Sequence, residues 1–253
     1  FNFRSNEQAN FSKLLNAHLS SPDAPLLLEG ATGLGKTRAY LYPLLEAANS
    51  GKKIAIILPT RQLIEQLLNS TDLEVCNESG VEVQVFIPKR YFEDASQYKE
   101  QREKALNAPV MLCTSASVII DQRLGGDYNG VTKRDYLLFD EADQLPEVAA
   151  LQSDVTIAYQ TLKDFNIKPV SAQQAADELL KKKHVEPEDR AKAKMIVEAL
   201  AEPFWFRSAG LNDENGIALF HKLPGRLLKR IANQQNTAFV SATLTIANKF
   251  DDF

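Results

Sequence analysis

The 253-residue sequence contains only two cysteines, Cys76 and Cys113, and no apolar run approaches the roughly 18 residues that a membrane span requires. Two cysteines exclude a disulfide-rich scaffold, and they also exclude a zinc or iron–sulfur site that takes four cysteines from one chain. So few cysteines favour a reducing compartment. We therefore predict a cytoplasmic protein that has neither a membrane segment nor an iron–sulfur cluster.

The sequence also has no excess of basic residues. It holds 29 Lys and Arg against 33 Asp and Glu, which gives a formal net charge of −4. This balance argues against nonspecific adhesion to nucleic acid through bulk charge, although it is compatible with a local basic groove. With 44% hydrophobic and 25% charged residues, the composition is that of an ordinary globular protein.

From Leu26 to Asp140, short apolar runs alternate with amphipathic stretches. The expected strands are 26–28, 52–58, 81–87, 110–114 and 136–140, and the expected helices are 36–48, 60–73 and the polar stretch 88–107. Strands separated by helices indicate an α/β fold, a parallel sheet with helices on both faces. The nearly continuous apolar strands fit burial on both sides.

The pattern changes after Pro146. Residues 147–236 are mostly helical in pattern, and Thr237 to Val240 is again a short apolar strand. We therefore expect a main domain at 1–146, a mainly helical insertion at 147–236 and a return to the main sheet at 237–253.

A phosphate-binding loop of the form G-x-x-x-x-G-K-[ST] follows the first expected strand and opens a helix. Its residues are Gly30, Ala31, Thr32, Gly33, Leu34, Gly35, Lys36 and Thr37. Backbone N–H groups and the helix N-terminus favour phosphate at this place. Lys36 is predicted to reach the β- and γ-phosphates, and Thr37 to place its hydroxyl on Mg²⁺. The alternative, a glycine-rich turn with a solvated lysine, does not account for the strand–loop–helix context.

Two acidic residues follow the apolar strand that ends at Phe139. The carboxyl ends of strands are where open α/β sheets bind ligands. Asp140 is predicted to hold Mg²⁺, and Glu141 to orient and deprotonate an attacking water. The alternative is a solvated acidic turn. With the phosphate loop on the same chain, we predict catalytic roles for Lys36, Asp140 and Glu141.

These motifs resemble those of superfamily-two helicases. Asp140 to Asp143 reads D-E-A-D, and Ser241, Ala242 and Thr243 resemble the third helicase motif. Pro59, Thr60 and Arg61, with Gln66, resemble motif Ia, and Thr114 and Ser115 lie where the next motif is expected. The resemblance implies a RecA-like P-loop fold that uses ATP and Mg²⁺. It also implies that motif Ia, Thr114-Ser115 and the third motif serve nucleic-acid contact and coupling.

Within that superfamily the sequence is most similar to the DinG/XPD-like branch. Arg4 and Gln8 fit its adenine-reading R-x-x-x-Q motif, and the run from Gly35 to Pro43 resembles its G-K-T-x-A-Y-L-x-P signature. The expected insertion lies where that branch carries its arch domain. The resemblance implies an ATP-dependent DNA helicase that moves on single-stranded DNA or a forked duplex.

The sequence departs from this branch in three places. The interval that holds four cluster-binding cysteines has only Cys76 and Cys113, the acidic box ends in Asp143 where the branch usually has His, and Thr114-Ser115 is not followed by an Asn-His pair. These departures point to a cluster-free relative, and we favour the DinG-like helicases of type IV CRISPR systems, with a CRISPR effector complex as a partner.

Helicase motifs four to six are not found in these residues. We therefore expect the first motor lobe of a longer protein, whose partner is a second RecA-like lobe, and we expect the isolated chain to be inactive or very weak. Two other functions remain open: a nucleotide-dependent nucleic-acid-binding or recruitment module without unwinding activity, and a P-loop transferase of small molecules.

Overall fold

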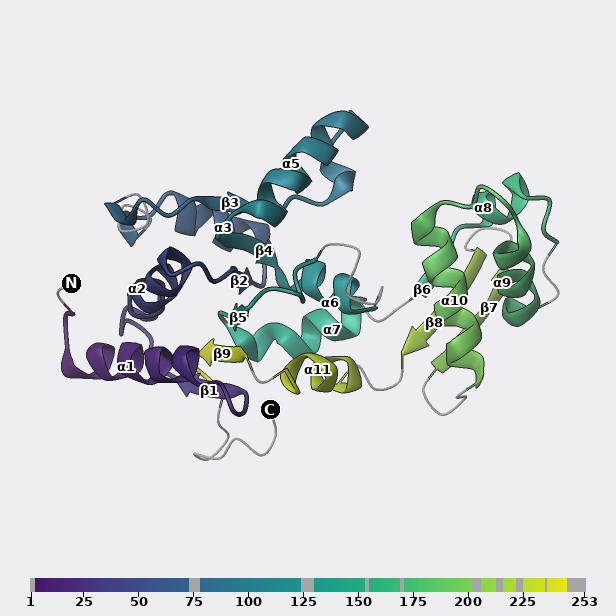
Figure 1. Cartoon of the computed structure of the whole chain (residues 1–253). Helices are drawn as coiled ribbons and strands as arrows, with labels where there is room; N and C mark the ends of the chain where they lie inside the picture. Colours follow the sequence, from purple (N-terminus) through teal and green to yellow (C-terminus); the bar gives the residue numbers. More distant parts are fainter. Residues whose placement is uncertain are drawn as a thin grey trace. The chain divides into compact units, whose positions relative to one another are not determined.

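The computed structural model describes residues 3–72, 78–123, 130–152, 155–168, 171–201, 206–212, 216–221, 225–234 and 236–244. The chain divides into two compact units, seen in Figure 1. The first unit comprises Phe1–Val148 and Leu227–Phe253, and the second comprises Ala149–Arg226.

The first unit is built on a six-stranded parallel sheet with the order β1-β9-β5-β2-β4-β3. The strands are β1 (Leu26–Glu29), β2 (Ile54–Leu58), β3 (Val83–Val85), β4 (Val110–Thr114), β5 (Tyr136–Phe139) and β9 (Thr237–Ser241). The α/β prediction with a RecA-like parallel sheet is therefore confirmed. The strand that returns after the insertion, β9, lies between β1 and β5.

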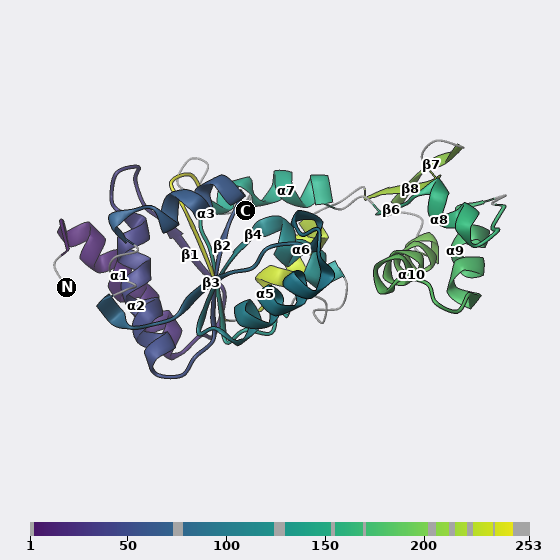
Figure 2. The ribbon, with the colours of Figure 1, turned by 90° about the horizontal axis from the view of Figure 1, so that it is seen from above.

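Helices cover both faces of this sheet, with α1 and α2 on one side and α5 and α6 on the other (Figure 2). The helices are α1 (Asn6–Ser20), α2 (Lys36–Asn49), α3 (Arg61–Leu68), α5 (Ala95–Asn107), α6 (Ser115–Arg123), α7 (Leu145–Gln152) and α11 (Gly225–Ala232), with short 3-10 turns η1 (Lys89–Tyr91) and η2 (Ala142–Gln144). Helices α7 and α11 span the boundaries between the units.

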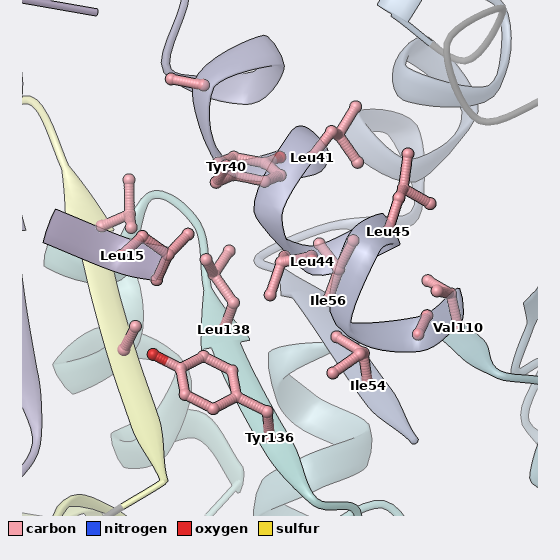
Figure 3. Packing of buried hydrophobic residues seen from close by; sticks show 14 of the residues in the cluster. Leu15, Tyr40, Leu41, Leu44, Leu45, Ile54, Ile56, Val110, Tyr136 and Leu138 are labelled. Carbon is pink, nitrogen blue, oxygen red and sulfur yellow. The ribbon is translucent and has the colours of Figure 1, made fainter. Parts of the chain in front are cut away.

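The core on the α1–α2 face is formed by alternate residues of the central strands and by the inner sides of the two helices. Ile54, Ile56 and Leu138 face Leu15 of α1 and Leu44 of α2 (Figure 3), and all five side chains are fully buried. This alternation is the period of two that a strand imposes on its side chains.

Several boundaries differ from those expected. Helix α3 ends at Leu68 rather than at Leu73, because Asn69 closes it with an N–H that donates to the carbonyl of Glu65; Leu73 itself lies outside the described residues. The stretch 88–107 is divided into η1 and α5, since the side chain of Asp94 caps a new helix by accepting from the N–H of Ser96. Helix α1 was not predicted.

A buried arginine ties three elements together at the opposite edge of the sheet from the phosphate loop. The guanidinium of Arg134 donates to the carbonyls of Ala105 and Leu106 in the last turn of α5, to those of Ala108 and Pro109 beyond it, and to that of Ile54 in β2, at 2.7 to 3.3 Å. The last carbonyls of a helix have no partner within it, so Arg134 serves as the C-terminal cap of α5.

The second unit contains helices α8 (Tyr159–Asp164), α9 (Ala172–Lys181) and α10 (Pro187–Ala201) and a three-stranded antiparallel sheet. The strands are β6 (Val155–Ile157), β7 (Phe206–Asn212) and β8 (Gly216–His221), in the order β6-β8-β7. Helices and strands share their own core, which includes Leu162, Leu179, Ile196 and Ile217. The sequence pattern of 147–236 therefore predicted helices but did not predict this sheet.

In the part of the chain that the structure describes, no helix has the length and apolar character needed to cross a membrane.

Candidate nucleotide and nucleic-acid site

All the candidate site residues that follow a strand of the first unit lie at one edge of the sheet, where its parallel strands end. The phosphate loop follows β1, the acidic box follows β5 and the Ser241–Thr243 motif follows β9. Because β9 lies between β1 and β5, these three segments are neighbours. Motif Ia and Thr114-Ser115 follow β2 and β4, farther along the same edge.

The phosphate loop has the backbone that its glycines predict. Gly33 and Gly35 have φ values of 85° and 76°, in the left-handed region that favours glycine. Helix α2 starts at Lys36, whose Nζ donates to the carbonyl of Gly30 at 3.1 Å. The N–H of Gly30 donates to the carbonyl of Ser241 at 3.0 Å, so the start of the loop is joined to the end of β9.

Gln8 bonds to the end of the phosphate loop where α2 begins. Its side chain is fully buried; its Nε2 donates to the carbonyl of Gly35 at 3.0 Å, and its Oε1 accepts from the N–H of Arg4 at 2.7 Å. A Cβ on Gly35 would lie 2.5 Å from that Nε2. The structure thus brings Gln8, the backbone of Arg4 and the phosphate loop together, and the adenine-reading role of Arg4 and Gln8 stays a prediction.

Asp140 is nearly buried and is held by two hydrogen bonds. Its Oδ2 accepts from the hydroxyl of Tyr40 at 2.9 Å, and its Oδ1 accepts from the N–H of Glu141 at 3.0 Å. Burial raises the pKa of Asp140 to about 6, while the hydrogen bond from Tyr40 acts in the opposite direction. Glu141 lies beside it with a positive φ of 47°, an uncommon conformation for a residue with a side chain, and such strain is concentrated at functional sites.

The donor set fits Mg²⁺. Thr37 and Asp140 both lie near the phenol of Tyr40: burial and Asp140, which accepts its hydrogen bond, raise the pKa of the phenol, whereas Thr37 lowers it. Among the described residues no group of three or more His, Cys, Asp or Glu side chains could hold a metal ion. One carboxylate and one hydroxyl suit a cation that keeps waters and takes its other ligands from substrate phosphates, as Mg²⁺ does.

The thiol of Cys113 does not fit an iron–sulfur ligand. It is completely buried in β4, and burial raises its pKa to about 12, so that it stays protonated, whereas a cluster binds thiolates. Cys76 lies outside the described residues. The absence of a cluster therefore stays a prediction that the chemistry of Cys113 supports.

Asp143, which the sequence marked as a departure, joins the acidic box to the third motif. Its Oδ1 accepts from the hydroxyl of Ser241 at 2.5 Å, and its Oδ2 accepts from that of Thr243 at 3.0 Å. Ala242 lies between these two hydroxyl residues in the chain. A carboxylate has no donor of its own and accepts on both oxygens, so Asp is suited to holding two hydroxyls at once.

Several residues expected to contact nucleic acid form hydrogen bonds to other parts of this chain. Thr60 caps α3 by accepting from the N–H of Leu63 at 3.3 Å. The hydroxyl of Ser115 donates to the carbonyl of Leu58 at 3.4 Å, and Thr114 forms a hydroxyl pair with Ser117 at 3.0 Å. Pro59 is buried at the end of β2, while Arg61 and Gln66 are exposed on α3. These residues follow β2 and β4, so they lie next to the nucleotide loops along the same edge of the sheet.

Tyr40 and Glu29 belong to the site but were given no role from the sequence. Tyr40 is part of the α1–α2 core (Figure 3) and bonds to Asp140. Glu29 accepts from the N–H of Leu244, just beyond the third motif, at 2.9 Å. A signal was available for Tyr40, because it follows Thr37 by three residues and so shares a helix face with it.

The fold and these loops define a RecA-like P-loop lobe of a superfamily-two helicase. Residues 11–177 match the family model for DEAD/DEAH box helicases. The chain therefore belongs to the DEAD/DEAH box helicase family.

Curated relatives include the DEAD-box ATP-dependent RNA helicases CshB of Staphylococcus aureus and CshC of Bacillus cereus. The chain is 27% identical to CshB over 150 residues, which cover 58% of this chain and 32% of CshB. It is 28% identical to CshC over 214 residues, which cover 76% of this chain and 51% of CshC. The chain thus spans between a third and a half of the length of these relatives.

Solved structures with a similar fold include those named "XPD_APO" and "Truncated XPD". The first has a TM-score of 0.56 at 14% identity and is matched over 94% of this chain and 53% of its own. The second has a TM-score of 0.56 at 13% identity and is matched over 95% of both chains. At this identity the likeness shows the fold alone.

Proposed function

We propose that this chain is the ATP-binding motor lobe of a helicase that couples ATP hydrolysis to movement along a single nucleic-acid strand. One observation carries the proposal: the phosphate loop, the acidic box and the third motif meet at the adjacent ends of β1, β5 and β9, joined by hydrogen bonds. A solvated glycine turn or an isolated acidic turn requires none of these connections.

Different residues of the lobe bind the phosphates of ATP, hold Mg²⁺ and activate water. Backbone N–H groups of the phosphate loop and the N-terminus of α2 bind phosphate, and Lys36 neutralises its charge. Gln8 supports the loop by its hydrogen bond to the carbonyl of Gly35. Thr37 and Asp140 would hold Mg²⁺, which offsets the charge that develops on the phosphates. Glu141 orients and deprotonates the attacking water. The intact set of Lys36, Asp140 and Glu141 favours hydrolysis over a binding module that has lost it.

The bonds of Asp143 to Ser241 and Thr243 give the lobe a connection from the acidic box to the segment beyond β9. Any change in the acidic box when the nucleotide changes is transmitted to the hydroxyls of the third motif. Glu29 adds a second connection, from the end of β1 to Leu244. We propose that these contacts couple nucleotide state to the grip on nucleic acid.

For the finer identity, we propose a cluster-free DinG-like helicase that acts on single-stranded or forked DNA, with a second RecA-like lobe and a CRISPR effector complex as partners. Support comes from the position of the second unit between the acidic box and the third motif, from Arg4 and Gln8, and from the scarcity of cysteine. The curated relatives are named RNA helicases, so the nucleic acid is the point to test.

The test compares ATP hydrolysis by the intact protein in the presence of single-stranded DNA and of RNA with the same length and sequence. We expect DNA to stimulate hydrolysis more than RNA. Stronger stimulation by RNA would contradict the DNA proposal and leave the helicase proposal standing. No hydrolysis with either strand would contradict the helicase proposal itself.

Replacing Tyr40 with Phe is expected to weaken Mg²⁺ binding by about tenfold, the order found for partners that orient metal ligands. The change removes only the hydroxyl that bonds to Asp140. Loss of that hydrogen bond also raises the pKa of Asp140 further above about 6, so protons compete with Mg²⁺ at higher pH. Mg²⁺ titrations of ATP hydrolysis and of fluorescent-nucleotide binding, at pH 6 and pH 8, measure both effects.

The matched control for this variant is Tyr42→Phe, two residues further along α2, where the tyrosine side chain is exposed. It should keep the parental Mg²⁺ requirement, since its ring packs edge-on against Phe3. If Tyr40→Phe kept the parental Mg²⁺ requirement at both pH values, Tyr40 would only fill the core.

A further inference from the structure

The strand order divides the C-terminal edge of the main sheet into two halves. The ends of β1, β9 and β5 carry the nucleotide segments, whereas those of β2, β4 and β3 do not. Motif Ia follows β2, and Thr114-Ser115 follows β4. The segment after β3, which includes η1, completes this second half, and the sequence assigned it no role.

The 3-10 turn η1 ends in an exposed aromatic residue. Half of the surface of Tyr91 is accessible, one of few large hydrophobic side chains with this much exposure among the described residues. The turn is fixed by its own backbone: the N–H of Tyr91 donates to the carbonyl of Pro88, and that of Phe92 to the carbonyl of Lys89. Phe92 packs against Tyr98 of α5 with ring centroids 5.7 Å apart, and so anchors the segment.

Arg61 of motif Ia contacts the ring of Tyr91. Its guanidinium carbon lies 4.9 Å from the ring centroid, and its Nε is 3.0 Å from a carboxylate oxygen of Glu65 on the same helix. A guanidinium over an aromatic face is favourable, and Glu65 restricts its orientation. The ring is therefore supported on one side by a residue expected to contact nucleic acid.

We infer that Tyr91 is a stacking platform for one base of the bound single strand, with Arg61 and Glu65 holding its ring in place. The inference rests on the proposed function, because it supplies a base contact to the strand that motif Ia holds by its backbone. An exposed aromatic ring beside a cationic side chain is the combination that proteins use to bind single strands without regard to sequence. A ring held in advance loses less conformational freedom on binding. Because every base has a π-face, this contact is expected to tolerate any base.

The test measures binding of two fluorescent oligonucleotides of equal length to the intact protein, with a non-hydrolysable ATP analogue present. One is oligo(dT), and the other has abasic sites in place of its bases. Tyr91→Ala is expected to weaken binding of oligo(dT) by about 5- to 150-fold and to leave the abasic strand within about twofold of the parent. Tyr91→Phe, which keeps the ring, should bind both strands like the parent.

Leu14→Ala is the matched control, because Leu14 is a similarly exposed apolar side chain on α1, at 55% accessibility. It should leave both affinities unchanged, and nucleotide affinity should be parental in every variant. An equal loss for both strands, or no loss for either, would overturn the role of Tyr91 as a stacking platform and leave the proposed function standing. Failure of the parent protein to bind any single strand would instead contradict the proposed function.

Discussion

Replacing Glu141 with Gln is expected to preserve ATP binding and to lower ATP hydrolysis by about two to four orders of magnitude. Gln keeps the size of the side chain, and the residue can keep its backbone hydrogen bond to Asp140, so the carboxylate proposed to hold Mg²⁺ stays in place. What is lost is the group proposed to accept a proton from the attacking water. Steady-state hydrolysis and nucleotide affinity, measured on the intact protein with single-stranded DNA, separate the two effects.

Two variants serve as references for this experiment. Lys36→Ala should weaken nucleotide binding itself, because it removes the cation that neutralises the phosphates. Glu147→Gln makes the same chemical change at an exposed position of α7 and should hydrolyse ATP like the parent. Parental hydrolysis by Glu141→Gln would show that another group activates the water.

Replacing Arg134 with Met is expected to lower the free energy of unfolding by about 3 kcal/mol or more. Met fills a similar volume but has no donor, so buried carbonyls at the end of α5 and at the start of β2 lose their partners. Burial lowers the pKa of Arg134 only to about 10, so the guanidinium is still charged at neutral pH and its hydrogen bonds are charge-assisted.

Urea unfolding followed by circular dichroism measures this loss. Lys133→Met is the control, because it removes a positive charge from the adjacent exposed position. A decrease for Arg134→Met no larger than for Lys133→Met would mean that water replaces the guanidinium at those carbonyls.

The main sheet was largely predictable, because most residues of its strands are apolar and the strands alternate with clear helix signals. The strand 110–114 has the predicted bounds, and the helix expected from residue 60 begins there, with Thr60 as its N-terminal cap. Helix α1 was missed although Phe11, Leu15 and Leu19 repeat every four residues. Buried polar side chains interrupt that stripe: Gln8 serves the phosphate loop, and His18 contacts the hydroxyl of Tyr136.

In the second unit, the expected helices are present, and the sheet was missed for a different reason. Strand β6 has only three residues, too few to show an alternating pattern, and it pairs with β8 far along the chain. Gly216 begins β8 at a positive φ, and a Cβ there would lie 2.0 Å from the carbonyl oxygen of Ile157. That close approach of two strands depends on tertiary structure.

The candidate site was predicted motif by motif, but its connections were not. Tyr40 and Asp140 are bonded across a hundred residues of sequence. Asp143 meets Ser241 only because β9 enters the sheet next to β5. Strand order decides these neighbours, and local sequence carries no information about it.

The central position of β9 has a consequence for how the protein is made. During synthesis β1 and β5 emerge early, yet neither can form its ladder with β9 until Thr237–Ser241 has left the ribosome. Until then two apolar strand edges stay open, and such edges are sites of aggregation. The second unit has its own core and can fold during this interval. Its folding shortens the distance along which the segments before and after it must find each other. Closing the main sheet is therefore expected to be the last and slowest step of folding, because its contacts are the most distant in sequence.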